Sequence, residues 1–358
     1  MKIRPVLALA LASALATLHA AQAEQAMKKP YGLVIHGGAG VIVRDKFSPE
    51  LEAQYRAELQ RSLEAGYAVL AAGGSALDAV VAAIKPLEDS PLFNAGKGAV
   101  LNADGQCELD ASIMDGRTLA AGAIAGVTRV KNPIILARAV MEKSPHVMFT
   151  GAGAERFAEQ LGGIDLVPNE YFQTDRRRED LKRAQEKEKQ ERNRRASLSR
   201  RDGPVFATSD ENDSIDRERK WGTVGCAALD QQGNLAAGTS TGGMTNKKFG
   251  RVGDAPIIGA GTYAGNATCA VSATGHGEYF IRIGVARDIA AQMEYKGATL
   301  AQAAEASLAK VAQLGGDGGV VAIDRDGRVA MPFNTPGMYR GFRLSSGSSA
   351  IEIFAAKK

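Results

Sequence analysis

The sequence predicts an α+β fold with antiparallel sheets. Extended runs follow one another through short glycine-containing turns, as at 223–243 and 318–334. Helical patterns lie in groups between these runs instead of alternating with single strands, which disfavours the βαβ repeat of a dinucleotide-binding fold. The motif HGGAG at 36–40 also lacks the GxGxxG spacing that such a fold requires.

The first elements are a strand and two helices. YGLVIHGGAG at 31–40 predicts a short buried strand that ends in a glycine turn. A helix follows, because Ser48 and Pro49 suit its first turn and the glycine pair at 73–74 stops it. A second helix is predicted over 75–89.

Strand patterns then replace the helical ones. The stretch 98–116 predicts a hairpin around a turn at 103–105, and 121–130 predicts another strand. Helices are predicted over 132–144 and 151–161.

The composition changes in the stretch 173–220. Between Arg176 and Arg201 lie 12 Lys or Arg and 5 Asp or Glu, with almost no large apolar side chain. Such a segment cannot bury a core face, so it predicts a solvated helix or a disordered linker. A basic patch that binds nucleic acid is the more specific alternative, but the segment has no interleaved aromatic residues. This segment alone contributes +7, whereas the whole chain carries +4, so the basic charge belongs to one segment and not to a general surface. We therefore expect no nucleic-acid partner.

Folded structure is predicted to resume after residue 221. The expected elements are strands around a turn at Gly233 within 223–243, strands at 256–265 and 269–277, helices over 278–295 and 299–314, and a closing hairpin over 318–334.

The N-terminus has the features of an export signal. Lys2 and Arg4 precede an apolar run over 6–18 that is too short to span a bilayer comfortably, and the residues at 21–23 fit a small-x-small cleavage site. We therefore expect removal of 1–23, a periplasmic or secreted location, and no membrane association afterwards.

The chain has three cysteines, and an odd number cannot form a disulfide framework. We expect them to be small core residues, although the sequence leaves open whether two of them pair. They are Cys107, Cys226 and Cys269.

The usual catalytic sets do not occur in this sequence. The four histidines show no HExxH spacing, and there is no GxSxG motif. Hydroxyl and glycine residues cluster instead in the second half, beginning with Gly222-Thr223. A free α-amine can act as the base for the hydroxyl of its own threonine, once the preceding peptide bond is cut. The plain alternative is that Thr223 is an ordinary β-branched residue that opens a strand.

A series of long motifs runs through the chain. These are HGGAG (36–40), PLEDSPLFNAGKGAVLN (86–102), ELDASIMDG (108–116), GTVGCAALD (222–230), STGGMTNKKFGRVGDAPIIGAGTYA (240–264), SATGHGE (272–278) and PFNTPGMYRG (332–341). In this order they resemble the plant-type L-asparaginases, or isoaspartyl peptidase/L-asparaginases, of the Ntn-hydrolase superfamily. The resemblance implies one four-layer αββα sandwich, made as a precursor and cut into an α subunit (24–222) and a β subunit (223–358). It also implies hydrolysis of β-aspartyl dipeptides and L-asparagine with release of L-aspartate.

The resemblance implies roles for the residues around the nucleophile. Thr223 matches the threonine freed by cleavage after Gly222. Thr241 matches the threonine that aids its activation, and Asn94 matches an asparagine that supports its surroundings. Thr274 and Gly275 match the pair that donates to the oxyanion.

The resemblance also implies the groups that bind the substrate head. Arg251 matches the residue that grips the α-carboxylate, for which a guanidinium fork is suited. Asp254 matches the partner of the α-ammonium group, and Gly277, together with Gly275, matches a further substrate contact.

A structural sodium ion and an (αβ)₂ assembly are implied by the same resemblance. Backbone carbonyls would hold the ion, since oxygen ligands suit a hard cation. They belong to Leu87, Glu88, Ser90, Phe93, Ala95 and Lys97. No cofactor is expected for catalysis.

Three alternative functions stay open from the sequence. A glycosylasparaginase shares the fold, but its nucleophile motif typically has Asp where this chain has Gly222. A taspase-like endoprotease fits less well, because Arg251 and Asp254 suit a free aspartyl head group. A non-catalytic periplasmic amino-acid-binding protein would leave the Gly222-Thr223 junction without a purpose.

Overall fold

The computed structural model describes residues 29–202 and 222–356. The predicted export signal at 1–23 and the linker residues 203–220 lie outside the described residues. The elements in chain order are β1 (Gly32–Gly40), η1 (Arg44–Lys46), α2 (Pro49–Ala71), α3 (Ala76–Asp89), β2 (Leu109–Asp115), β3 (Ala121–Val127), α4 (Pro133–Lys143), β4 (Met148–Thr150), α5 (Gly151–Leu161), η2 (Asn169–Tyr171), α6 (Asp175–Asp202), β5 (Val224–Leu229), β6 (Leu235–Thr241), β7 (Thr262–Ala264), β8 (Cys269–Gly275), α8 (Gly277–Ile283), α9 (Val285–Lys296), α10 (Leu300–Gln313), β9 (Gly318–Asp324), β10 (Val329–Ala330), β11 (Gly337–Leu344) and β12 (Ser349–Phe354).

The described strands form two sheets. The larger has the order β12-β11-β1-β5-β6-β2-β3-β4, and the smaller has the order β10-β9-β8-β7. Paired strands are antiparallel except β3 and β4, which are parallel. The predicted α+β fold with antiparallel sheets is confirmed.

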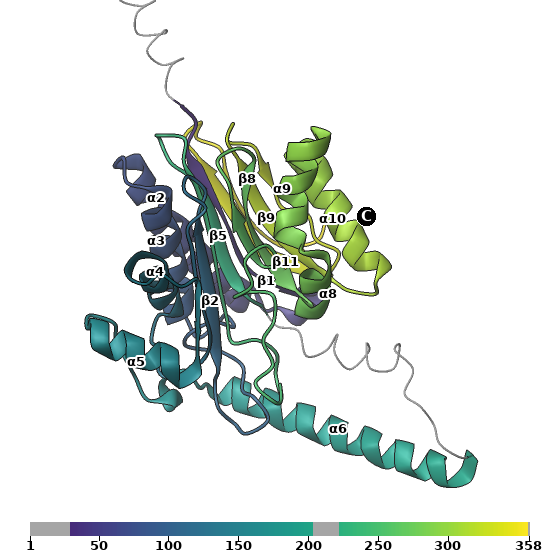
Figure 1. Cartoon of the computed structure of the whole chain (residues 1–358). Helices are drawn as coiled ribbons and strands as arrows, with labels where there is room; N and C mark the ends of the chain where they lie inside the picture. The colour runs from purple at the N-terminus through teal and green to yellow at the C-terminus, as the bar shows by residue number, and fades with distance from the viewer. Residues whose placement is uncertain (1–28, 203–221, 357–358) are drawn as a thin grey trace, which may run out of the picture.

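Helices flank the paired sheets on opposite sides (Figure 1). Helices α2, α3 and α4 cover the larger sheet, where Ile84 belongs to an extended apolar core. Helices α9 and α10 cover the smaller sheet around Ile289. A third apolar cluster, which includes Val34 and Val321, lies where the two sheets meet. The site described below lies at the ends of strands from both sheets.

The helix starts follow from local chemistry that the sequence predicted. The Ser48 hydroxyl accepts a hydrogen bond from the Leu51 N–H at 3.2 Å, and proline follows at the first helical position of α2. The Ser75 hydroxyl accepts from the Asp78 N–H at 3.1 Å at the start of α3. Both caps satisfy backbone donors that have no partner inside the helix.

Strand β1 corrects one prediction. The glycine motif at 36–40 does not end the strand, because β1 continues to Gly40 and pairs with β11 along its length. The pairing register shifts between His36 and Gly38, and Gly38 has a φ of 110°. A β-bulge at glycine therefore replaces the predicted turn.

The predicted hairpin over 98–116 is also wrong in part. The turn is present, since the Gly105 N–H donates to the Asn102 carbonyl at 3.1 Å, but only Leu109–Asp115 is a strand. The other arm contacts a different segment, with the Ala103 N–H donating to the Lys247 carbonyl at 2.9 Å. Tertiary contacts decide the conformation here, which the local pattern could not indicate.

Three predictions in the second half need correction. The helix expected over 278–295 is divided into α8 and α9 at Gly284, whose φ is 65°. Within 256–265 only Thr262–Ala264 is a strand. The chain does not close at 334, because β11 and β12 follow and form one edge of the larger sheet.

Helix α6 occupies the first part of the charged segment and extends as a long rod (Figure 1). Of the two alternatives predicted for this segment, the helix is correct over Asp175–Asp202. Its first turns are not fully solvated, since Arg177 and Leu181 are buried.

Two further observations concern the chain as a whole. Within 29–202 and 222–356, no helix combines the length and apolar character needed to cross a bilayer. Cys107, Cys226 and Cys269 are free and buried, as predicted for small core residues.

Candidate active site

Thr223 and Thr241 meet because β5 and β6 are antiparallel neighbours. Thr223 directly precedes β5, Thr241 ends β6, and Val224 pairs with Ser240 in the register. The Thr223 hydroxyl lies 3.2 Å from the Thr241 hydroxyl and donates to it. The hairpin through Gly233, predicted from sequence, therefore brings these two hydroxyls together.

Asn94 holds the turn that follows Thr241. Its amide nitrogen donates to the Gly243 carbonyl at 2.8 Å, and its side-chain oxygen accepts from the Val100 N–H at 2.9 Å. The Thr241 hydroxyl in turn accepts from the Gly243 N–H at 3.0 Å. Asn94 thus orients Thr241 through the backbone and is itself fixed at both ends of its amide.

Gly222 sits in a tight backbone contact with the bulge of β1. Its φ is 55°, in the left-handed region that favours glycine. A Cβ at Gly222 would lie 2.8 Å from the Gly37 carbonyl oxygen, and one at Gly38 would collide with the Gly222 Cα. Gly38 and Gly222 must therefore both lack a side chain. The backbone before Thr223 has a left-handed conformation and lies in close contact with β1.

Thr274 and Gly275 lie at the end of β8 in the smaller sheet. The Thr274 hydroxyl accepts a hydrogen bond from the Ala39 N–H at 3.3 Å, one residue after the glycine that touches Gly222. The proton of the Thr274 hydroxyl remains able to donate elsewhere. The smaller sheet therefore presents donors beside the segment that leads to Thr223.

Arg251, Asp254 and Gly277 form one cluster. A Cβ at Gly277 would lie 2.9 Å from both the Arg251 guanidinium and an Asp254 carboxylate oxygen. Asp254 is buried, and this burial raises the pKa of its carboxyl to about 7, although Arg251 acts in the opposite direction. One Asp254 oxygen has no hydrogen-bond partner among the described residues. A buried carboxylate with an unused oxygen is suited to receive a cation such as an ammonium group.

Glu278 is a charged residue of this cluster that the sequence reasoning missed. Its carboxylate accepts two hydrogen bonds from Arg251, at 2.9 and 2.8 Å. Hydrogen bonding and charge from Arg251 outweigh burial and lower the pKa of Glu278. The only signal was its position directly after Gly277 in the motif SATGHGE.

His36 is the second residue that sequence reasoning missed. The sequence considered it only as a metal ligand, whereas the structure places its Nδ1 atom 2.9 Å from the Thr223 carbonyl oxygen. Burial lowers the pKa of His36 to about 3, so the ring is neutral. Since Nδ1 donates to the carbonyl, Nε2 accepts from the Ser272 hydroxyl at 2.8 Å.

Buried hydroxyls extend this contact between the two sheets. Ser272 lies 2.7 Å from the Thr239 hydroxyl, which lies 2.5 Å from the Thr262 hydroxyl. The Ser112 hydroxyl bonds to Thr262 at 2.8 Å and donates to the Ala255 carbonyl at 2.6 Å. A continuous series of hydrogen bonds therefore connects Thr223 with the residue after Asp254.

The segment 87–98, which the sequence treated as a loop over Leu87 to Lys97, consists of the last turn of α3 and the loop after it, and it has oxygen donors suited to a monovalent cation. The Phe93 carbonyl oxygen would lie 2.8 Å from a Cβ at Gly98, and the Glu88 carbonyl accepts from the Lys97 N–H at 2.7 Å. Carbonyl oxygens of Glu88, Pro91 and Phe93 thus lie close to the backbone of Gly96 and Gly98. Neutral oxygen donors fit a hard cation, and the described residues contain no cluster of three His, Cys, Asp or Glu for a transition metal.

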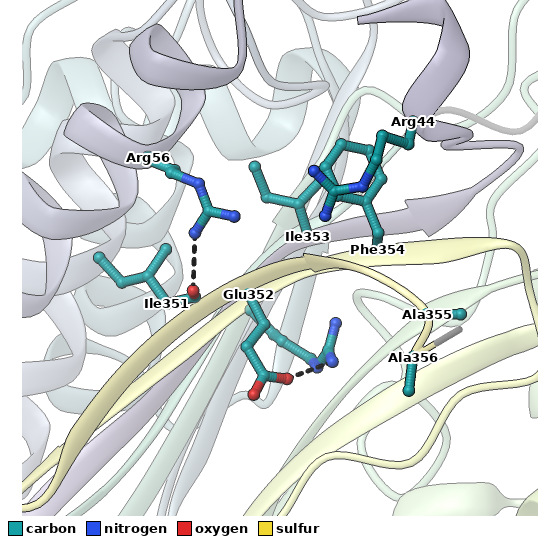
Figure 2. A pocket seen from close by; sticks show the side chains of 9 residues that line it. Arg44, Arg56, Ile351, Glu352, Ile353, Phe354, Ala355 and Ala356 are labelled. Carbon is teal, nitrogen blue, oxygen red and sulfur yellow. Dashed lines mark hydrogen bonds and ion pairs between the residues drawn. The ribbon is translucent and has the colours of Figure 1, made fainter. Parts of the chain in front are cut away.

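A separate pocket of about 480 Å³ opens beside β12, and none of the predicted site residues line it (Figure 2). The cationic side chains in this pocket already have partners. Arg56 donates to the Ile351 carbonyl at 2.8 Å, Arg340 pairs with Glu352, and Arg44 lies over the Phe354 ring. The three arginines are therefore already engaged in contacts at the edge of the larger sheet.

Comparison with known proteins decides the family. The sequence profile of a family described as asparaginase matches residues 28–353. The chain belongs to this family. The resemblance stated from the sequence motifs is confirmed.

Other members of the asparaginase family align over nearly their full lengths. An isoaspartyl peptidase of Escherichia coli (strain K12) is 49% identical over 91% of this chain and 96% of its own length. An isoaspartyl peptidase/L-asparaginase of Mus musculus is 44% identical over 82% of each chain. A relative from Arabidopsis thaliana is 41% identical over 90% of this chain and 99% of its own length.

Proposed function

We propose that this member of the asparaginase family is an amidohydrolase that cuts β-aspartyl dipeptides and L-asparagine and releases L-aspartate. We further propose that it activates itself by cleavage between Gly222 and Thr223. The observation that carries the proposal is the Thr223 hydroxyl at 3.2 Å from Thr241, directly after a left-handed glycine. The relatives' names, isoaspartyl peptidase and L-asparaginase, support the substrate class.

Self-cleavage uses the packed backbone at Gly222. The Thr223 hydroxyl oxygen attacks the Gly222 carbonyl carbon, its proton passes to the Thr223 nitrogen, the C–N bond breaks, and the acyl group remains on the hydroxyl oxygen as an ester. Water then hydrolyses the ester, which leaves a carboxylate on Gly222 and a free α-amine on Thr223. Gly222 adopts its left-handed conformation without strain because it has no Cβ, and the close contact with β1 supports this conformation before the attack.

Substrate hydrolysis uses the newly formed amine. The amine takes the proton of the Thr223 hydroxyl as the oxygen attacks the side-chain amide carbon of the substrate. An α-amine pKa of roughly 7.7–8.0 is close to neutral pH, where a general base works best. Thr274 and Gly275 donate to the developing oxyanion. The leaving amine takes the proton, and water cleaves the acyl-enzyme to give L-aspartate.

The Arg251 cluster binds the aspartyl head group. The guanidinium fork of Arg251 matches the two oxygens of an α-carboxylate. The unused oxygen of Asp254 receives the α-ammonium group, and the absence of a side chain at Gly277 leaves room for it. A zwitterionic head is therefore bound by opposite charges three residues apart.

The proposed maturation divides a single αββα domain into two subunits. The α subunit spans 24–222 and the β subunit spans 223–358. The order of helices, larger sheet, smaller sheet and helices supports the four-layer arrangement of Ntn-hydrolases (Figure 1). We also propose an (αβ)₂ assembly and export through the signal at 1–23, which fractionation of expressing cells would test.

A sodium ion held by the segment 87–97, at the end of α3 and in the loop after it, is part of the same proposal. The backbone carbonyls of the six residues predicted from the sequence would hold it, and the glycine positions among them support this. Its contribution would be structural, because it would order the loop that contains Asn94.

The test is intact mass and N-terminal sequencing of wild type, Thr223→Ala and Thr223→Ser. Wild type should give two fragments, one beginning at Thr223-Val224, and Thr223→Ser should also be cut because it retains a hydroxyl. Thr223→Ala should stay uncut and inactive. An uncut but active wild type would refute the mechanism. Comparison of a β-aspartyl dipeptide, L-asparagine and a glycosylated asparagine as substrates then decides the specificity.

A further inference from the structure

The segment 244–251 carries Arg251 and has a strained backbone. Asn246 and Phe249 have φ values of 61° and 58°, and Gly250 has 66°. Non-glycine residues in this region persist only when their surroundings hold them there. The Arg251 N–H donates to the Lys248 carbonyl at 3.0 Å, so the position of Arg251 depends directly on this turn.

One side of the segment is held by the body of the protein. The Asn246 N–H donates to the Leu101 carbonyl at 2.8 Å, and the Lys247 ammonium donates to the Glu108 carbonyl at 3.0 Å. These contacts leave the side chains of Asn246 and Lys248 for a partner on the other side.

Helix α6 provides that partner through Glu188. The Glu188 carboxylate accepts a hydrogen bond from the Asn246 amide at 2.7 Å and forms an ion pair with Lys248. Both contacts involve a charged group and are therefore stronger than neutral hydrogen bonds. The neighbouring Gln185 donates to the Ala103 carbonyl at 3.0 Å, which fixes the same turn of the helix.

Two arginines fix the start of α6 to the rest of the protein, so the helix can hold Glu188 in place. Arg177 is buried, and its Nε atom donates to the Gly98 carbonyl at 2.7 Å. Arg176 donates to the Tyr55 hydroxyl at 3.1 Å. From these anchors α6 continues as one rod (Figure 1). Glu188 lies 11 residues after Arg177, which is about three helical turns.

We propose that Glu188 is a positioning residue, which holds 244–251 so that Arg251 meets the substrate α-carboxylate. The inference rests on the proposed function for the role of Arg251. It gives the charged segment, for which the composition predicted only a solvated helix or a linker, a task at the substrate site. After cleavage, Glu188 would belong to the α subunit and Lys248 to the β subunit, so the α subunit would support the part of the substrate site that the β subunit carries.

The experiment compares wild type, Glu188→Gln and the control Glu186→Gln. Glu186 is exposed on the same helix, so the control makes the same change of charge away from the contact. Glu188→Gln should raise KM for a β-aspartyl dipeptide about threefold to tenfold, the range expected from loss of one or two partly exposed charged contacts. The kcat value and self-cleavage should change less than about twofold, because neither depends directly on Arg251. The control should match wild type.

Two further measurements separate positioning from general loosening. Hydrogen exchange of the amides at 244–251 should be faster in Glu188→Gln and unchanged elsewhere. The charge exchange Glu188→Lys with Lys248→Glu should recover part of the lost affinity.

An unchanged KM in Glu188→Gln, or a parallel loss of kcat and thermal stability, would overturn the inference. A wild type that hydrolyses neither substrate would refute the proposed function instead, and exchange at 244–251 would still test Glu188.

Discussion

At the scale of single residues, Asp254 shows how burial prepares a side chain for a charged ligand. Its carboxyl lies beside Arg251, yet burial raises its pKa to about 7. The ionised form of Asp254 is therefore unfavourable in free energy until a cation binds beside it. Below pH 7 most of the free protein carries a neutral Asp254, which attracts an ammonium group poorly.

This titration predicts a pH dependence of head-group binding. L-aspartate, which carries the head group without needing hydrolysis, should bind about tenfold more weakly at pH 6 than at pH 8, since one protonation step changes affinity by up to tenfold per unit. Calorimetry across this range measures it. In Asp254→Asn the affinity should be low and nearly independent of pH. Equal affinity of wild type at both pH values would contradict the assignment.

Glu278 occupies the same guanidinium that the substrate is proposed to use. The substrate carboxylate must share Arg251 with it or displace it. Glu278→Gln should therefore lower KM for a β-aspartyl dipeptide about twofold to fivefold, the range expected for a partly exposed ion pair.

Glu294→Gln is a matched control for this prediction. It removes another exposed ion pair, to Arg287 at 2.9 Å, without touching the site. A higher KM in Glu278→Gln would show instead that Glu278 orients Arg251.

At the scale of elements, the bulge of β1 places the backbone of Gly38 against the backbone of Gly222. Gly38→Ala would put a methyl group into the Gly222 Cα. We expect self-cleavage to slow about tenfold or more, because overpacking costs about 1–3 kcal/mol and here acts on the reacting segment. Gly73→Ala is the control, since Gly73 also has a positive φ, of 82°, but open space around it. The uncut fraction over time, measured by gel electrophoresis, gives both rates, and equal rates would refute the role of the contact.

The predictability of an element depended on the range of the interactions that define it. Ser48 and Ser75 cap their helices through contacts three residues away, so the sequence predicted both starts. The first arm of the 98–116 hairpin failed because its partner, Lys247, is far along the chain. The predicted glycine turn at 36–40 was wrong for a related reason. Gly38 is needed there for the close approach to Gly222, a contact between residues far apart in the sequence.

The site followed the same pattern. The contact between Thr223 and Thr241 lies across a hairpin that the sequence predicted, and the resemblance to the family supplied the remaining residues. Neither source indicated Glu278 or the hydroxyl chain from His36. Glu278 meets Arg251 only through the packing of distant segments, and the hydroxyl chain depends on the contact between the two sheets. Glu188 lies in a segment whose composition predicted only solvation.

At the scale of the whole molecule, the two proposed subunits are interleaved. Strand β1 of the first half lies between β11 and β5 of the second half, and β2 of the first half pairs with β6 of the second. Separation of the halves would break three rows of backbone hydrogen bonds and expose the core on both faces.

We therefore expect the cleaved halves to remain together. They should co-elute as one species in size-exclusion chromatography of the native protein and separate only in denaturant. Uncut Thr223→Ala is the reference for the elution volume of the intact fold. Separation in native buffer would show that the sheet order does not hold the halves.

The central place of β1 would also make the proposed maturation a one-way event. Before cleavage, an unfolded molecule can fold again alone, since β1 is tied to the strands on either side of it. After cleavage, the same step requires an encounter between two molecules, so recovery depends on concentration and competes with aggregation. The working lifetime of the cleaved protein would then be set by how slowly it first opens, because folding again afterwards would require both halves to meet.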